Sequence, residues 1–275
     1  KESGQVVNDR TTNWSISPCP TPNWAKLVFP DKPEHEALAA LEQHVAHVLR
    51  LDEPDPIAAW RARADTLTSA ARRLTERGFD ALHYDAPGTD LTIGLFPNAS
   101  WDAARFETVD GIEHMPNLPT EEVFTTPDPE RTEGHVASSK PLVLADGTVV
   151  NGLRMRFEGG RAVQIDADTA QDTMRTIAAH DSGAARLGEV ALVDAEGRIG
   201  KLDTVFYDTL LDENAASHVA LGSAYEAAVA KEDVDRINRS SVHVDFMVGS
   251  ADVDVTGITR EGERVPVLRA ATWQL

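Results

Sequence analysis

Acidic and histidine side chains that could bind metal ions or move protons gather in four separated segments. The first reads Asn-Leu-Pro-Thr-Glu-Glu-Val-Phe (117–124) and holds two adjacent acids. In an extended segment, successive side chains point to opposite sides, so only one of Glu121 and Glu122 can face a given site. Taken alone, such a segment is more often a solvated acidic turn before a strand.

The second segment, Leu-Gly-Glu-Val-Ala-Leu-Val (187–193), places one acid at the start of an apolar run. Glutamate is almost never fully buried unless its charge is paired or binds a metal. Glu189 therefore needs a partner if it points inward. The alternative is an exposed glutamate at the edge of a strand.

The other two segments supply imidazole groups. His218 lies among small residues in Leu-Asp-Glu-Asn-Ala-Ala-Ser-His-Val-Ala-Leu-Gly (211–222), and Tyr225 would follow about two turns later if this stretch were helical. A single histidine in such a context is usually structural. In a strand, His243 and Asp245 would project to the same face, as metal ligands or as a hydrogen-bonded pair on a sheet surface.

The four segments together offer a mixed set of carboxylate and imidazole ligands, which suits Zn, Co, Mn or Fe. Two divalent ions with a bridging carboxylate would use all of them, and such a pair can polarise a carbonyl and generate hydroxide near neutral pH. The set comprises Glu122 or Glu121, Glu189, His218, His243 and Asp245. The phosphate-loop pattern GxxxxGK[ST], the GxSxG elbow and the HExxH motif are all absent from the sequence.

The elements that must position these residues follow an α+β pattern, with helices first and mainly antiparallel strands later. Apolar periodicity predicts helices at 34–49 and 55–77, the second ended by Gly78. A further helix is expected at 167–179, and a last hairpin is formed by 252–259 and 266–271. Other short segments rich in β-forming residues lie at 81–84, 90–95, 140–144, 149–157, 161–165, 188–193 and 242–248.

We expect the N-terminal helices to pack on a curved, mainly antiparallel sheet. Residues 1–33 are rich in proline, asparagine and tryptophan without a helical period, which predicts an extended linker before a domain at 34–275. The 275 residues carry a formal net charge of −19, which disfavours nucleic acid and anionic membranes as partners. The single cysteine fits a reducing, cytoplasmic location.

Several of these motifs, in this order, resemble the aminopeptidase T and aminopeptidase S family of metalloexopeptidases. The resemblance begins at about Asn13 and includes Pro-Thr-Pro-Asn-Trp-Ala-Lys-Leu-Val-Phe-Pro (20–30). It continues through 117–128, Arg-Thr-Glu-Gly (131–134), 187–193, Phe-Tyr-Asp-Thr-Leu-Leu-Asp-Glu-Asn-Ala-Ala-Ser-His-Val-Ala-Leu-Gly (206–222) and His-Val-Asp-Phe-Met-Val-Gly (243–249). Family members carry a further α/β region upstream, so we expect this sequence to be the C-terminal catalytic part.

The resemblance implies an enzyme that releases N-terminal residues from peptides with two divalent ions (Co, Zn, Mn or Mg), as a homodimer when full-length. It assigns the metals to Glu122, Glu189, His218, His243 and Asp245, with Glu189 bridging. Glu121 then becomes a candidate general base, and Tyr225 a group that stabilises the tetrahedral intermediate. The alternatives are a mononuclear Fe(II) ring-cleaving oxygenase of a distantly related type and an inactive metal-binding fragment.

Overall fold

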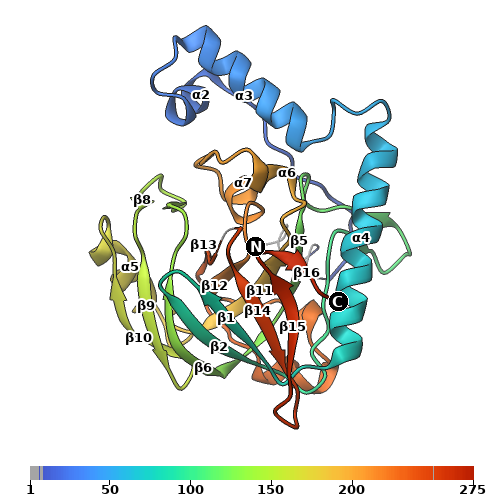
Figure 1. The fold of residues 1–275 in the computed structure, drawn as a ribbon, viewed down its shortest axis with the longest axis vertical. Helices are drawn as coiled ribbons and strands as arrows, with labels where there is room; N and C mark the ends of the chain where they lie inside the picture. The colour runs from blue at the N-terminus through green and yellow to red at the C-terminus, as the bar shows by residue number, and fades with distance from the viewer. Residues whose placement is uncertain (1–5, 7–8, 250) are drawn as a thin grey trace.

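The structure is a computed structural model that describes residues 6, 9–249 and 251–275. Helices α2 (Pro22–Val28), α3 (Glu34–Val48) and α4 (Pro56–Arg77) precede a body of strands. Figure 1 shows α2 and α3 projecting beyond the strands, whereas α4 runs along one side of them. An apolar cluster holds α2 and α3 to the short helices α6 (Arg198–Lys201) and α7 (Thr209–Glu213).

The expected helices are present, and their ends follow ordinary capping chemistry. Asp55 accepts a hydrogen bond from the backbone of Ala58 at the start of α4, and Gly78 ends the helix in the left-handed conformation. The prediction that residues 1–33 are wholly extended is wrong, because α2 lies within them. Its start is encoded by Thr21, which caps the helix, and by a proline in the first turn.

The larger of the two main sheets has eight strands in the order β10-β9-β6-β2-β1-β14-β15-β16. Its pairings are all antiparallel. The strands are β1 (Ala81–Ala86), β2 (Thr89–Leu95), β6 (Pro127–Ala137), β9 (Arg154–Glu158), β10 (Arg161–Asp166), β14 (Asp254–Ile258), β15 (Arg264–Arg269) and β16 (Thr272–Trp273).

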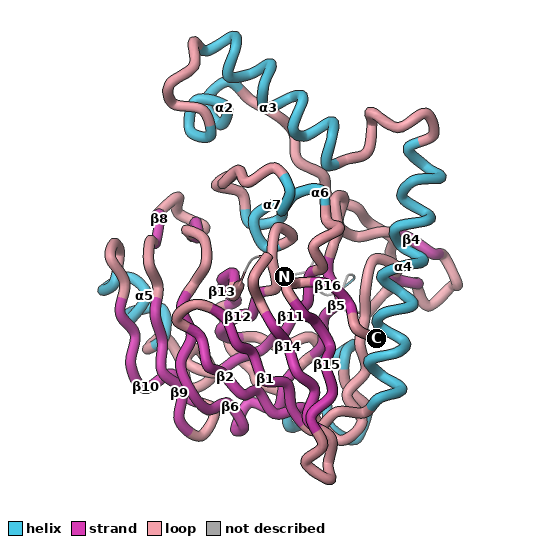
Figure 2. Tube along the Cα trace, in the orientation of Figure 1, coloured by secondary structure: helices cyan, strands magenta, loops and turns pink. Residues whose placement is uncertain are grey.

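The smaller main sheet has four antiparallel strands in the order β13-β12-β11-β5. They are β5 (Glu122–Thr125), β11 (Leu187–Val193), β12 (His218–Gly222) and β13 (His243–Met247). Two short hairpins pair β3 (Phe106–Glu107) with β4 (Glu113–His114), and β7 (Leu142–Val143) with β8 (Val149–Val150). Figure 2 shows the strands gathered in the body and the helices at its margins.

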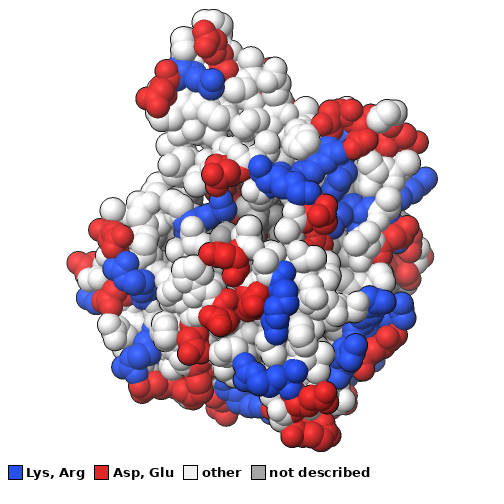
Figure 3. Space-filling model, viewed as in Figure 1, with Lys and Arg blue, Asp and Glu red and all other residues white. Residues whose placement is uncertain are grey.

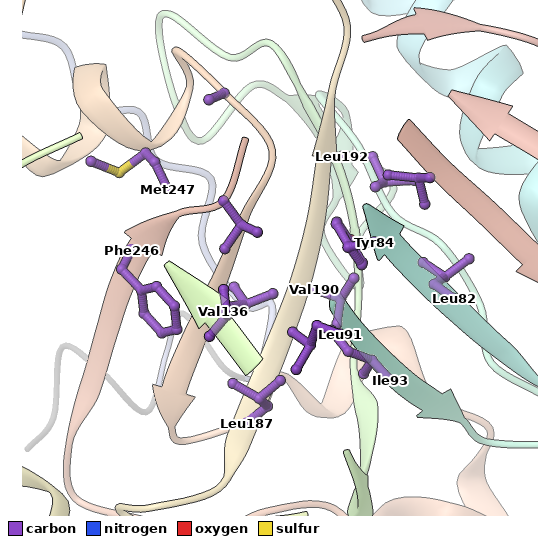
Figure 4. Packing of buried hydrophobic residues seen from close by; sticks show 14 of the residues in the cluster. Leu82, Tyr84, Leu91, Ile93, Val136, Leu187, Val190, Leu192, Phe246 and Met247 are labelled. Carbon is purple, nitrogen blue, oxygen red and sulfur yellow. The ribbon is translucent and has the colours of Figure 1, made fainter. Parts of the chain in front are cut away.

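One hydrophobic core joins the two main sheets and α4. Figure 4 shows Tyr84 and Leu91 of the larger sheet packed close to Val190 and Leu192 of the smaller one. Phe246 of the smaller sheet, fully buried, belongs to the same core. The smaller sheet therefore has one face committed to the core, and its other face is free to carry polar groups.

The α+β class with mainly antiparallel sheets is confirmed, although the strands form two main sheets where one was expected. The segment predicted as one strand at 149–157 is split into β8 and β9 around Gly152, whose φ is +58°. The helix expected at 167–179 is shorter, at α5 (Gln171–Ala178), and short 3-10 helices lie at Glu226–Ala228 and Lys231–Arg236.

The distribution of surface charge and the apolar character of the helices indicate how the protein could meet a membrane. On the face shown in Figure 3, acidic and basic side chains are interspersed, so the net negative charge does not form one continuous patch there. Within the described residues, no helix combines the length and the apolar character needed to cross a bilayer.

Candidate metal centre

The free face of the smaller sheet carries all five predicted ligands. Glu189 pairs with Ala220, which pairs with Asp245 on the next strand, and residues paired across antiparallel strands share a face. His218 lies two residues before Ala220 and shares its face by the same alternation. His243 and Glu122 also lie on this face, the latter through its pairing with Val193 of β11. We call Glu122, Glu189, His218, His243 and Asp245 the acid–histidine cluster.

Small residues make room for the cluster between the strands. Ala191 lies opposite His218 and Phe124, where a larger side chain would fill the space in front of the sheet. The β11–β12 register shifts between Leu187 and Glu189, and a Cβ added to the intervening Gly188 would lie 2.3 Å from the carbonyl oxygen of Gly222. Glycine is therefore required where the ladder brings Glu189 into the cluster.

The cluster divides into two groups that share one residue. One ligand atom from each of Glu122, Glu189 and His218 lies within 4.8 Å of the others, and the same holds for Glu189, His243 and Asp245. We call these the first group and the second group. The closest contacts are 3.0 Å between His218 Nε2 and Glu122 Oε2, and 3.3 Å from His243 Nε2 to both Glu189 and Asp245.

Backbone carbonyls fix the orientation of both imidazole rings. His218 Nδ1 lies 3.2 Å from the carbonyl oxygen of Ala216, and His243 Nδ1 lies 2.8 Å from that of Ser223. A carbonyl oxygen only accepts hydrogen bonds, so each Nδ1 must carry the hydrogen. In the neutral rings, Nε2 is then a lone-pair donor directed at the carboxylates, which is the usual arrangement of a metal-binding histidine.

Burial and the neighbouring charges both shift the pKa values of the cluster, and at the two histidines they oppose each other. Burial alone would lower the pKa of His218, but the hydrogen bond to Glu122 and the nearby carboxylates raise it to about 10. His243 behaves in the same way beside Asp245 and Glu189, with a pKa raised to about 11. Burial raises the pKa of Glu189, the hydrogen bond from His243 partly offsets this, and the neighbouring acids add to the upward shift. These carboxylates therefore require cations, which the imidazolium groups supply when no metal is bound.

A cavity of about 740 Å³ opens in front of the cluster. Tyr225 lines it, with its hydroxyl 3.5 Å from His243 Nε2. Its ring packs edge-on against Phe124, with 5.6 Å between the two ring centroids. Burial and the neighbouring carboxylates raise the pKa of Tyr225, so its hydroxyl keeps its hydrogen at neutral pH. The sequence allowed a helix around His218, but this residue begins strand β12, and Tyr225 lies in the loop that follows the strand.

Glu121 does not reach the cavity. It is fully buried on the other side of the strand, where its carboxylate lies 2.5 Å from Arg63 Nε and 2.9 Å from Arg50 Nη2. The expected alternation of the adjacent acids is thus present, with Glu122 toward the cluster.

Glu213 lines the same cavity, although sequence reasoning did not single it out. It ends α7, and burial together with the charges of Asp245 and Glu122 raises its pKa well above the ordinary range. The only signal in the sequence was its position five residues before His218, inside a motif already noted for the histidine.

Comparisons with known proteins identify the family of the chain. A family model described as thermophilic metalloprotease (M29) matches residues 1–273. Aminopeptidase T of Thermus aquaticus is 47% identical over 98% of this chain and 67% of its own length. Aminopeptidase 2 of Geobacillus stearothermophilus is 40% identical over 98% of the chain and 66% of its own length. A structure of wild-type AmpT from Thermus thermophilus superposes with a TM-score of 0.93 at 43% identity, covering 99% of this chain and 68% of that one.

These relatives and the cavity beside the acid–histidine cluster define the chain as a metal-dependent aminopeptidase. The chain belongs to the M29 metalloprotease family, whose model it matches along nearly its whole length. It spans about two thirds of the length of the curated relatives it matches.

The fold is shared more widely than the activity. A 2,5-dihydroxypyridine dioxygenase from Pseudomonas putida KT2440 superposes with a TM-score of 0.56 at 12% identity, over 98% of this chain and 75% of that one. At this identity the likeness shows the fold alone. The peptidase interpretation therefore prevails over the oxygenase alternative.

Proposed function

We propose that this aminopeptidase binds two divalent ions, one in each group of the acid–histidine cluster, with the Glu189 carboxylate shared between them. The observation that carries the proposal is the membership of Glu189 in both groups. A bridging carboxylate is the expected feature of a site in which two ions lie about 3.5–4 Å apart. The mixed oxygen and nitrogen donors suit Co, Zn or Mn, and we include Mg from the family resemblance.

The residues present fit such ions in three respects. Both histidines present Nε2 toward the carboxylates, as their carbonyl partners require. The acids are buried and close together, an arrangement that is costly without cations to offset it. The cavity in front of the cluster leaves space for a substrate.

When bound, the ions would polarise the scissile carbonyl and lower the pKa of a water molecule. The chain supplies the remaining groups. Tyr225 keeps its hydroxyl hydrogen and can donate it to the oxygen on which negative charge develops. Glu213, at the cavity wall, can accept a proton from the attacking water and return it to the leaving amine. We assign this role to Glu213 in place of Glu121, whose carboxylate oxygens are occupied by arginines.

A carboxylate at the cavity wall also explains why the substrate should have a free N-terminus. Glu213 lines the cavity and belongs to neither metal-binding group, so its carboxylate stays available when the ions are bound, and a protonated α-amine placed beside it gains a favourable charge interaction. An acetylated peptide has no such charge. We therefore propose that the substrates are peptides and amino acid amides with a free N-terminus.

Two further proposals rest on the family resemblance and on the single cysteine, respectively. We propose that the full-length protein is a homodimer and that it acts in the cytoplasm, where its exposed Cys19 would stay reduced. Light scattering at high concentration tests the first, and a monomer would contradict it. Fractionation of the source cells tests the second, and recovery of the protein outside the cytoplasm would contradict it.

Metal content and substrate choice test the central proposal. Elemental analysis should give two ions per chain, and anomalous scattering from metal-soaked crystals should place one in each group. The loaded protein should release the first residue of free peptides and leave acetylated ones intact. Saturation at one equivalent would refute the two-ion site, whereas equal cleavage of both peptides would refute the exopeptidase assignment.

A further inference from the structure

We propose that Glu121 is a positioning residue: a buried ion-pair network around its carboxylate fixes the start of β5 and thereby sets the metal affinity of the first group. The inference rests on the proposed two-ion site. It concerns the neighbour of a metal ligand, since Glu121 directly precedes Glu122. The two side chains point to opposite faces of the strand, so Glu121 can act on the site only through the backbone.

Both oxygens of the Glu121 carboxylate are occupied by groups from other elements. Arg63 on α4 donates from Nε to Oε2 at 2.5 Å. Arg50, just beyond α3, donates from Nη2 to Oε1 at 2.9 Å, and the backbone of Arg198 donates to the same oxygen at 3.4 Å. Glu121 is 0% exposed, so these partners replace water completely.

Arg63 also holds a second carboxylate at the end of a neighbouring strand. Its Nη1 and Nη2 atoms donate to the two oxygens of Asp194 at 3.0 and 3.1 Å. Trp273 donates from Nε1 to the same carboxylate at 2.6 Å, which brings the C-terminal strand into the network. One buried guanidinium therefore links helix α4, the start of β5 and the end of β11.

The position of this link relates it to the metal site. Glu122 and Val193 form the last pair between β5 and β11 at this end of the ladder. Glu121 and Asp194 are the residues immediately outside that pair. Arg63 therefore joins the two strands just beyond their last backbone pair, through the side chains of Glu121 and Asp194. It holds β5 and β11 together where backbone hydrogen bonds between them have ended.

The backbone of Glu121 is held independently from the histidine side of the site. Its N–H donates to Asn214 Oδ1 at 2.7 Å, and Asn214 is fully buried at the end of α7. Four residues later the chain reaches His218, whose Nε2 lies 3.0 Å from the Glu122 carboxylate. The network therefore controls how Glu122 meets its partner in the first group.

The second group should not respond to the same change. His243 and Asp245 lie on β13, at the opposite edge of the sheet from β5. Only Glu189 is common to both groups, and β11 and β12 separate β5 from β13. Loss of the Glu121 charge should therefore weaken one metal-binding step and leave the other intact.

The test is a stepwise metal titration of Glu121→Gln against a chelator of known affinity, with the metal-free protein as starting material. We expect two steps in the wild type. In the variant one step should weaken by about 10–100-fold, the usual effect of losing a partner that orients a ligand, and the other should stay within about threefold. Anomalous scattering should show the lower occupancy at Glu122. The matched control is Asp65→Asn, which removes an acid with a 68% exposed side chain from α4.

Other outcomes would overturn the inference. Equal weakening of both steps would show a general structural role. Two unchanged affinities with a rate reduced by about 10²–10⁴-fold would instead show that Glu121 acts as a general base. A wild type that binds one ion would refute the two-ion site itself.

If Glu121→Gln does not fold, Trp273→Phe provides a milder perturbation. It removes the N–H donated to Asp194 together with one ring of the indole, which packs against the edge of the core, and leaves the Glu121–Arg63 pair in place. We expect a smaller weakening of the same step, and no selective change would refute the network's role.

Discussion

Replacing Glu189 by glutamine tests the centre of the site, because this residue belongs to both groups. Glutamine keeps the shape of the side chain and one oxygen acceptor, so the fold should be retained. The lost charge lies within 4.8 Å of the other ligand atoms in a buried setting. An ion held between these atoms lies closer than 4.8 Å and carries two charges. The roughly 3 kcal/mol that a unit-charge interaction is worth at 4.8 Å, for an effective dielectric constant of about 20, is therefore a lower bound on the loss. Each ion should then bind at least about 10²-fold more weakly.

The loss of affinity translates into a change in thermal stability. An ion present at about 1,000 times its dissociation constant stabilises the native state by about 4.1 kcal/mol. At the same concentration, 10²-fold weaker binding leaves about 1.4 kcal/mol. The difference corresponds to a metal-induced rise in Tm that is about 5–10 °C smaller for each ion.

The assay compares metal content and Tm with and without metal for the wild type and Glu189→Gln. Glu196→Gln serves as the control, because its side chain is 80% exposed in the loop after β11. A variant that keeps two ions and the full metal-induced rise in Tm would refute the shared role of Glu189.

Three further outcomes follow from the structure. Tyr225→Phe removes one hydroxyl from the cavity and should lower kcat by about 10²–10³-fold in steady-state assays while both metals remain bound; an unchanged kcat would exclude its role. Phe246→Ala should lower the free energy of unfolding by about 3–5 kcal/mol in urea titrations, because its ring is fully buried, whereas Val163→Ala on the surface should change it little. Hydrogen bonds from Ser241, Ser240 and the backbone of Gly183 lower the pKa of Asp181 to about 2. The charged carboxylate therefore stabilises the fold above about pH 4, and this contribution is lost as the pH falls toward 2. Asp181→Asn should therefore unfold more easily than the wild type at pH 7, and the gap should close in acid; a constant gap would contradict the assigned pKa.

The class of fold and the four chemical segments could be predicted because they depend on local patterns. Strand alternation alone showed that Glu121 and Glu122 must diverge. It could not show which of them faces the cavity, because the deciding partners are distant in sequence: Arg63 lies on α4 and Arg50 just beyond α3. His218 was ambiguous because the small residues around it are compatible with both helix and strand.

Other features were out of reach or were missed. The proximity of Glu213 to the cluster depends on the packing of α7 against β13, which no sequence pattern encodes. The start of α2 was readable from the threonine and proline at 21–22, but the many prolines nearby favoured an extended interpretation. The role of the cluster as metal ligands stays a prediction until an ion is measured there.

The smaller sheet also depends on contacts between distant parts of the chain. The cluster is assembled from positions as far apart as 122 and 245, and β6, β9 and β10 of the larger sheet lie between β5 and β11 in the sequence. Contacts of such large sequence separation carry a high loop-closure cost and slow folding. An emerging chain therefore presents isolated acids and histidines, each a weak ligand. Only the completed sheet brings these side chains together, so the proposed ions would meet a convergent site in the folded enzyme alone.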